Sequence, residues 1–250
     1  MYVIPAIDLL SGRAVRLRRG RYDDVTTYDH TPTSLAAEWR RHVSHVHVVD
    51  LEGARVGAPV QKAAIKDIVA AFGPGVQVGG GVRSRANAEE YLALGVHRVV
   101  LGTAAISEPE LVAALARAFP ERIVVAVDAE DGWVKTEGWE KKTSRRVLDV
   151  VRELGELPLG GILYTDIARD GMEVGPNVDA TARLAMSTTI PVIASGGVGT
   201  LEHLRALRRA PGPIRAAIVG RALHERRFTL SEAVHSLRKV TSEAIGTDSV

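Results

Sequence analysis

The feature that most limits what this chain can fold into is an internal duplication. Landmarks in the first half of the 250 residues return in the second half after nearly constant spacings. The spacing is 120 residues from Asp8 to Asp128, 116 from Asp50 to Asp166, 116 from Gly81 to Gly197 and 118 from Gly102 to Gly220. Four landmarks at nearly one spacing indicate two similar units related by approximate twofold symmetry.

Each half alternates short apolar runs with longer segments of helical periodicity. Runs rich in β-branched residues predict strands at 2–7, 45–49, 76–78, 98–101, 123–127, 161–165, 191–194 and 216–219. Apolar residues three and four positions apart predict helices at 33–42, 60–72, 85–94, 108–119, 144–154, 178–186, 201–209 and 230–245. This order predicts an α/β fold, a (β/α)8 or TIM barrel made of two half-barrels.

The halves are not separated by a linker or a low-complexity segment. An isolated half-barrel would leave two sheet edges unpaired, which favours one closed domain. We therefore expect a single domain over residues 1–245, with half-barrels at about 1–120 and 121–245 and a short tail at 246–250.

Composition narrows the classes of partner. The formal net charge is only +2, so nothing in the charge balance calls for nucleic acid. No apolar run approaches the roughly 18 residues of a membrane span, and no basic region precedes the first apolar segment. The chain has no cysteine, which excludes disulfides and thiolate metal ligands. We expect a cytoplasmic monomer without membrane or nucleic-acid partners.

Polar residues and glycines follow the predicted strands in a regular pattern. Carboxylates follow the first, second, fifth and sixth strands, at Asp8, Asp50, Asp128 and Asp166. Glycines follow the other four. Since the carboxyl ends of all eight strands meet at one face of a barrel, these residues are expected to surround one active site.

The glycine turns predict two phosphate sites. Glycine lets a backbone N–H approach an anion closely, and a following helix N-terminus adds dipolar attraction. One site after the seventh and eighth strands is usual in this fold, and the duplication predicts another after the third and fourth. A bisphosphorylated small molecule would bridge them. The residues expected to bind it are Arg16, Gly80, Gly81, Arg83, Gly102, Thr103, Trp139, Gly171, Ser195, Gly196, Gly197, Gly220 and Arg221.

Asp8 and Asp128 occupy equivalent places across the mouth. That arrangement suits a base and an acid acting on the middle of a bisphosphate. The alternative is that such aspartates cap helices or bind arginines, which is favoured for Asp50 and Asp166. Asp170 follows in a loop that would bring it over the mouth.

Other conspicuous side chains have two interpretations. Trp139 is either a lid that stacks on a planar ring or a surface residue without function. The arginines at 13, 16, 18, 19 and 21 are typical of a solvated hairpin, from which Arg16 would reach an anion. For His45 and His47, packing or surface roles are favoured, because no matching ligand set has the spacing of a metal site.

Eight motifs together resemble one known family. They are IPAIDLLSGRAVRL, HVVDLEGA, VGGGVRS, VVLGTAA, TDIARDGM, GPN, ASGGV and IVGRAL. Spread over nearly the whole chain, they resemble the phosphoribosylformimino-5-aminoimidazole carboxamide ribotide isomerases of histidine biosynthesis. The resemblance implies an aldose–ketose isomerase that converts the bisphosphorylated aminoaldose ProFAR into the aminoketose PRFAR by an Amadori rearrangement, without metal or cofactor.

The resemblance also implies roles for individual residues. Asp8 matches the general base of the family and Asp128 its general acid. Thr165 matches a position that assists, and Asp170 matches one to which some members assign the acid role. Protonation of the furanose ring oxygen would open the ring to an imine, and removal of the C2′ proton would follow.

Four other functions remain as alternatives. The ending RRFTLSEAV resembles a bifunctional isomerase that also accepts phosphoribosyl anthranilate, but Glu137 stands where those enzymes tend to carry an arginine. The first strand differs from that of the related cyclase subunit of imidazole glycerol phosphate synthase. A non-catalytic sugar-phosphate barrel would be expected to lose Asp8 or Asp128, and a metal-dependent epimerase would need histidines at the strand ends.

Overall fold

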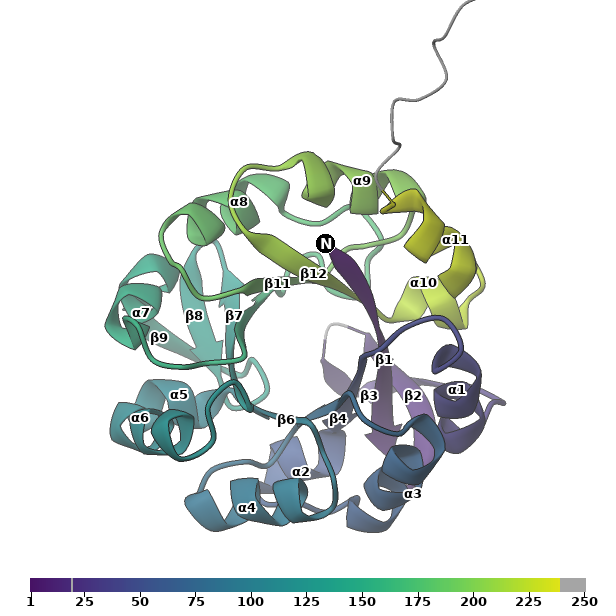
Figure 1. Ribbon diagram of the computed structural model, residues 1–250, viewed down its shortest axis with the longest axis horizontal. Coiled ribbons are helices and arrows are strands. Elements are labelled where there is room, and N and C mark those ends of the chain that lie inside the picture. The colour runs from purple at the N-terminus through teal and green to yellow at the C-terminus, as the bar shows by residue number, and fades with distance from the viewer. Residues whose placement is uncertain (19, 239–250) are drawn as a thin grey trace, which may run out of the picture.

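Eight parallel strands close into a barrel in the computed structural model, which describes residues 1–18 and 20–238 (Figure 1). In chain order they are β1 (Tyr2–Leu10), β4 (Val46–Asp50), β5 (Val76–Gly79), β6 (Arg98–Leu101), β7 (Ile123–Glu130), β10 (Gly161–Asp166), β11 (Val192–Ser195) and β12 (Ile214–Val219). Each pairs with the next strand, and β12 pairs with β1 to complete the circle. The predicted (β/α)8 barrel is confirmed.

A ring of helices covers the outside of the barrel (Figure 1). The main helices are α1 (Pro32–Trp39), α3 (Lys62–Phe72), α4 (Arg85–Ala93), α6 (Pro109–Ala118), α7 (Val147–Leu154), α8 (Val178–Met186), α9 (Leu201–Arg209) and α11 (Leu230–Ser236). Three short ones, α2 (Leu51–Val56), α5 (Thr103–Ser107) and α10 (Arg221–His224), directly follow barrel strands. Residues 239–245 of the predicted last helix and the predicted tail lie outside the described residues.

Two antiparallel hairpins extend from the barrel. The hairpin predicted after the first strand consists of β2 (Arg13–Arg18) and β3 (Arg21–Thr27). A second hairpin, β8 (Trp133–Thr136) and β9 (Lys141–Arg146), was not predicted. The helix predicted from residue 144 begins instead at Val147, because Lys141–Arg146 pairs with β8. That segment reads KKTSRR, without an apolar residue to indicate a strand.

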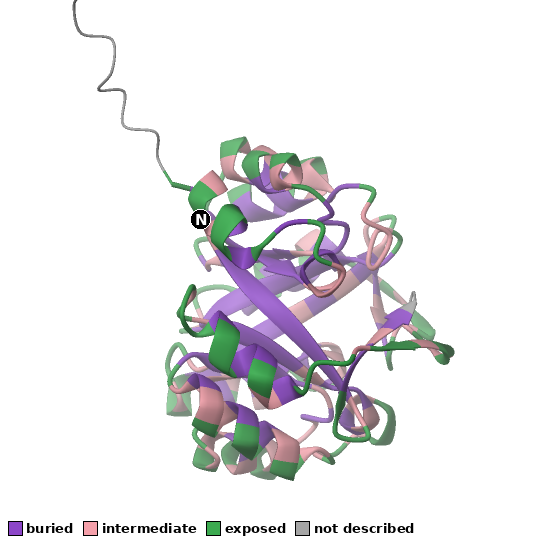
Figure 2. Cartoon of the chain, turned by 90° about the vertical axis from the view of Figure 1, so that its right-hand side faces the viewer, coloured by how far each residue is buried: buried purple, intermediate pink, exposed green. Residues whose placement is uncertain are grey.

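Apolar side chains fill the barrel below its mouth. The interior cluster consists of Ile4, Ala6, Val100, Val124, Leu163, Ile193, Ala216 and Ile218, all nearly inaccessible to solvent. A larger cluster packs the outer faces of the strands against the helices. Figure 2 shows the barrel strands buried and the outer faces of the helices exposed. The rigid, filled barrel therefore serves as a base that fixes the residues at the strand ends.

Backbone conformation repeats between the halves. Gly102 has φ −101° and ψ −94°, and Gly220 has φ −103° and ψ −95°. Gly80 and Gly81 have φ of 101° and 77°, and Gly196 and Gly197 have 89° and 86°. The left-handed region is open to glycine at little cost. The turns after β5 and β11 thus share one unusual geometry.

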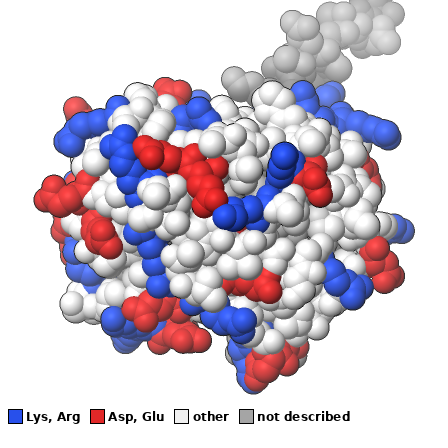
Figure 3. Space-filling view, turned by 90° about the horizontal axis from the view of Figure 1, so that it is seen from below, with Lys and Arg blue, Asp and Glu red and all other residues white. Residues whose placement is uncertain are grey.

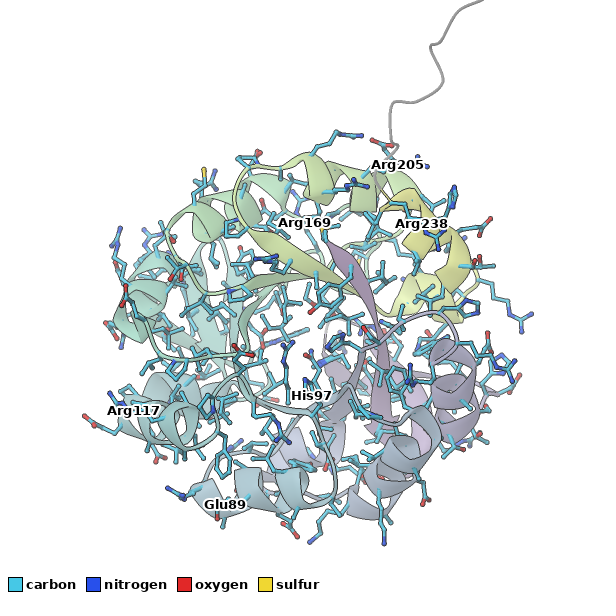
Figure 4. The ribbon with its side chains drawn as sticks, in the orientation of Figure 1. Glu89, His97, Arg117, Arg169, Arg205 and Arg238 are labelled. Atoms are coloured by element: carbon cyan, nitrogen blue, oxygen red, sulfur yellow. The ribbon has the colours of Figure 1, made fainter. Side chains whose placement is uncertain are left out.

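The surface carries charges of both signs. Figure 3 shows acidic and basic side chains interspersed over the face seen from below Figure 1. In Figure 4, Glu89 and Arg117 project outward from α4 and α6, whereas Arg169 lies inside the ring of helices.

Among the described residues, none of the helices has both the length and the apolar character needed to cross a membrane.

Candidate active site

A cavity of about 260 Å³ opens at the carboxyl ends of the barrel strands. All seventeen candidate site residues from the sequence line it. They are Asp8, Arg16, Gly80, Gly81, Arg83, Gly102, Thr103, Asp128, Trp139, Thr165, Asp170, Gly171, Ser195, Gly196, Gly197, Gly220 and Arg221. The structure therefore brings together side chains from both halves, although their individual roles stay predictions.

Arg16 bridges two of the three candidate catalytic carboxylates. Its guanidinium donates to Oδ2 of Asp8 over 3.0 Å and, through its other terminal nitrogen, to Oδ2 of Asp170. These side chains are only 16%, 11% and 14% exposed, so solvent screens the ion pairs weakly. Nε of Arg16 is buried without an acceptor among the described residues, which leaves one donor for a ligand.

Burial acts on the proton affinity of Asp8. Removal from water raises the pKa of its carboxyl, the Arg16 guanidinium opposes that rise, and the negative charge of Asp170 adds to it. The net shift is upward. A raised pKa makes Asp8 a stronger base than an exposed aspartate, while the ion pair with Arg16 favours its ionised form.

Asp128 lies in a different environment, with hydrogen-bond donors in place of a cation. The indole Nε1–H of Trp139 donates to its Oδ2 over 2.9 Å, and the hydroxyl of Thr165 is a second side-chain partner. Thr165 lies beside Asp128 in the register of β10 and β7. Burial raises the pKa of Asp128 against the effect of these two hydrogen bonds. A raised pKa suits a proton donor.

The glycine turn after β5 leaves no room for side chains. A Cβ at Gly80 would lie 2.1 Å from the carbonyl oxygen of Asp50, and one at Gly81 would lie 2.6 Å from that of Ala58. Real Cβ contacts are never this short, so both positions require glycine. The backbone of the turn therefore lies directly against the end of β4 and the segment after it. Its position at the cavity fits the predicted phosphate site.

The turn after β11 repeats this arrangement. A Cβ at Gly196 would lie 2.7 Å from the carbonyl oxygen of Asp166, and one at Gly197 would lie 2.4 Å from that of Gly175. Gly102 and Gly220, at the N-caps of α5 and α10, complete the two sites. Two glycine-lined sites therefore face the cavity from opposite halves of the barrel.

The two arginines next to the glycine turns already have partners. Arg83 donates to the carbonyl oxygen of Ala54 over 3.1 Å. Arg221 donates to the carbonyl oxygen of Gly171 over 2.7 Å and to Glu225 over 2.6 Å. Both line the cavity, but in this structure each one also holds a neighbouring loop in place.

Asp50 and Asp166 have the supporting contacts that the sequence favoured. Asp50 is fully buried and caps α2 through the N–H of Gly53 at 2.7 Å, and it also accepts from the N–H of Val60 and the hydroxyl of Tyr91. Asp166 accepts from the side chain of Asn177 over 2.7 Å. Neither residue lines the cavity.

His47 is a cavity residue that sequence reasoning did not include. It is 7% exposed, lines the cavity, and its Nδ1 is 3.0 Å from the side-chain nitrogen of Gln77. Burial lowers its pKa to about 4, so the ring is neutral at physiological pH. Side chains alternate between the two faces of a strand, and this alternation in β4 could have predicted that His47 points into the barrel.

No group of three or more His, Asp or Glu side chains in the described part of the chain is arranged to hold a metal ion. The groups that the cavity itself offers are its carboxylates, Arg16 and the glycine turns. Such a site defines a class: (β/α)8-barrel proteins that act on small phosphorylated molecules with side-chain acids and bases.

Comparison with known proteins gives the family. The model of the histidine biosynthesis protein family matches residues 2–229. This chain belongs to that family, as its motifs predicted.

Curated relatives agree over nearly the full length. The chain is 58% identical over 239 residues to the 1-(5-phosphoribosyl)-5-((5-phosphoribosylamino)methylideneamino)imidazole-4-carboxamide isomerase of Sorangium cellulosum, covering 94% of this chain and 99% of the relative. It is 48% identical to the isomerase of the same name from Sphingopyxis alaskensis, covering 93% and 96%. It is 46% identical to that of Dinoroseobacter shibae, covering 94% and 98%.

Proposed function

We propose that this protein is the aldose–ketose isomerase of histidine biosynthesis that converts ProFAR into PRFAR. The observation that carries the proposal is the placement of Asp8 and Asp128 at one cavity, between two glycine-lined sites on opposite sides. A substrate with a phosphate at each end would place its middle between the two carboxyl groups. Relatives up to 58% identical carry the name of this isomerase.

The proposed reaction moves protons without a change in overall composition. Asp128 protonates the furanose ring oxygen, the bond from that oxygen to C1′ breaks, and the glycosylamine becomes an open-chain imine. Asp8 then removes the C2′ proton to give an enolamine. Loss of the C2′ hydroxyl proton and protonation of C1′ complete the ketose. Each step needs only an acid or a base at the centre of the substrate.

The environments of the two carboxyl groups fit this division. Asp8 is paired with Arg16, and this positive charge favours the ionised carboxylate that accepts a proton. The side-chain partners of Asp128 are the neutral donors Trp139 and Thr165, and its raised pKa favours the protonated form. Asp170, held by Arg16 over the cavity, is the second candidate for the acid. We propose that Thr165 holds Asp128 in position.

A direct assay tests the proposal. Purified protein is incubated with ProFAR, with and without a chelator, and the products are separated by chromatography. We expect conversion to PRFAR at a rate that the chelator does not change, and the control Asp8→Asn should convert ProFAR about 10² to 10⁴ times more slowly. Absence of turnover by the unmodified protein, or dependence on an added metal, would overturn the proposal.

A further inference from the structure

The two glycine turns are supported by equivalent residues with different side chains. The backbone N–H of Arg83 donates to Oδ1 of Asn87 over 3.4 Å. The backbone N–H of Gly199 donates to Nδ1 of His203 over 3.1 Å. Both acceptors lie in the first turn of the helix that follows, α4 or α9. The second half therefore uses an imidazole where the first half uses an amide.

A second segment packs on the glycine turn after β11. The N–H of Gly175 donates to the carbonyl oxygen of Gly197 over 2.9 Å. A Cβ at Gly199 would lie 2.5 Å from the Cβ of Glu173. Segment 171–175 therefore lies directly on the turn, with no space between the two backbones.

His203 contacts both the glycine turn after β11 and segment 171–175. A neutral imidazole that accepts at Nδ1 carries its proton on Nε2. A Cβ at Gly175 would lie 3.3 Å from that Nε2, so the far edge of the ring packs against Gly175. One edge of the ring thus holds the glycine turn at Gly199, and the other supports segment 171–175.

Segment 171–175 follows directly after Asp170. Asp170 pairs with Arg16, and the next carbonyl oxygen, that of Gly171, accepts from Arg221. Because only a short stretch of backbone separates Gly175 from Asp170, a shift of Gly175 would also displace the Asp170 carboxylate. In the first half, the guanidinium of Arg83 packs against Gly57, 2.7 Å from a Cβ built at Gly57. The segment that contains Gly57 carries none of the proposed catalytic residues.

We propose that His203 is a positioning residue that couples the phosphate-binding turn after β11 to the segment that carries Asp170. Its Nδ1 fixes the turn, and its ring fixes the segment. Occupation of the turn by a phosphate group then also secures Asp170 over the reacting carbons. The proposal rests on the proposed function.

Two substitutions separate the two contacts. His203→Leu removes both the acceptor and the ring edge. His203→Asn keeps an acceptor at the same distance along the side chain, as Asn87 does in the first half, but lacks the ring. We expect His203→Leu to raise KM and to lower kcat by about tenfold to a hundredfold, the range for a slightly misplaced catalytic group. His203→Asn should restore KM while kcat stays low.

A matched control is His42→Leu, because His42 is exposed in the turn after α1 and does not line the cavity. It should have the kinetics of the unmodified protein. The proposal is overturned if His203→Leu also behaves like the unmodified protein, or if His203→Asn and His203→Leu change KM and kcat in the same proportion.

Hydrogen exchange of backbone amides gives a test that does not depend on turnover. His203→Leu should speed exchange in segments 170–177 and 196–200 and leave 79–83 unchanged, whereas His203→Asn should affect only 170–177. Uniformly faster exchange over the barrel, or no change, would contradict the coupling. If the exchange pattern is as expected while ProFAR is not converted by the unmodified protein, the proposed function fails and the structural coupling stands.

Discussion

Trp139 donates its indole N–H to the carboxylate of Asp128 over 2.9 Å, so the turn of the β8–β9 hairpin is tied to the carboxyl-terminal part of β7. The backbone of Trp139 has φ 76°, in a region that residues other than glycine rarely adopt. Its ring packs on the other hairpin, where a Cβ at Gly20 would lie 2.8 Å from Cε3. Trp139 therefore connects both hairpins to the proposed general acid.

The first prediction concerns this hydrogen bond. Trp139→Phe keeps an aromatic ring but removes the indole N–H. In the unmodified protein, the hydrogen bond from this N–H favours the ionised form of Asp128 and lowers its pKa. Without that donor, the pKa of Asp128 rises. An acid works only when protonated, so activity is lost as pH rises through its pKa. We expect the alkaline limb of kcat/KM for ProFAR to move to higher pH.

The comparison is a pH profile of kcat/KM for both proteins. Trp133→Phe serves as a control, because Trp133 lies in the neighbouring strand β8 and stacks with Arg146. An alkaline limb that moves to lower pH, or does not move, would show that Asp128 is not the titrating acid.

Much of this site was predictable from the sequence because it follows from strand order. Carboxylates and glycines that end barrel strands must meet at one face, whatever the loops do. The partner of Trp139 was not predictable, because its contact with Asp128 depends on the path of the β8–β9 hairpin. The same holds for the pairing of Arg16 and Asp170, which are 154 positions apart and lie in the β2–β3 hairpin and in the segment after β10. Loops of this length have no periodicity that fixes their conformation.

The second prediction concerns the glycine turns. Gly81→Val and Gly197→Val place a β-branched side chain at φ 77° and 86° and within 2.6 Å and 2.4 Å of backbone atoms. The turns must shift, so their N–H groups no longer reach a phosphate. We expect a KM for ProFAR raised at least about tenfold, equivalent to about 1.4 kcal/mol of binding energy.

Gly12→Val is the matched control for the cost of backbone strain. Gly12 has φ 74°, but a Cβ there would meet no atom within 4 Å. This variant should lose stability without a comparable rise in KM. Equal KM values for Gly197→Val and Gly12→Val would contradict a phosphate role for the turn.

A third prediction concerns substrate range. Glu137 lines the cavity and forms an ion pair with Lys141 at 3.2 Å. A carboxylate at this place repels the carboxylate of phosphoribosyl anthranilate, which disfavours that substrate. We expect little turnover of phosphoribosyl anthranilate by the unmodified protein and a gain with Glu137→Arg. Efficient turnover by the unmodified protein in the same assay would refute this specificity.

A fourth prediction assigns the proton transfers. Asp8→Asn and Asp128→Asn nearly preserve size and remove proton exchange, so each should lower kcat for ProFAR by about 10² to 10⁴ with a small effect on KM. Asp170→Asn also removes an ion pair of Arg16 and should be measured beside them. Near-normal kcat in Asp128→Asn together with its loss in Asp170→Asn would move the acid role to Asp170. An active Asp8→Asn would rule out the mechanism.

The last prediction links the proposed acid to stability. Burial raises the pKa of Asp128 in the folded protein above its value in the unfolded chain. The folded state therefore binds more protons over that interval, and the free energy of unfolding falls as pH rises from the unfolded pKa through the folded one. Asn is uncharged and can still accept the hydrogen bond from Trp139. Asp128→Asn should therefore raise Tm at neutral pH, and the gain should disappear below about pH 4, the ordinary range of an aspartate. Asp67→Asn, on the exposed side of α3, should change Tm little at either pH. The measurement is thermal unfolding of all three proteins at about pH 3 and about pH 7.5. A Tm of Asp128→Asn below that of the unmodified protein at pH 7.5 would mean that the ionised carboxylate stabilises the fold, and its assignment as an acid of raised pKa would then be wrong.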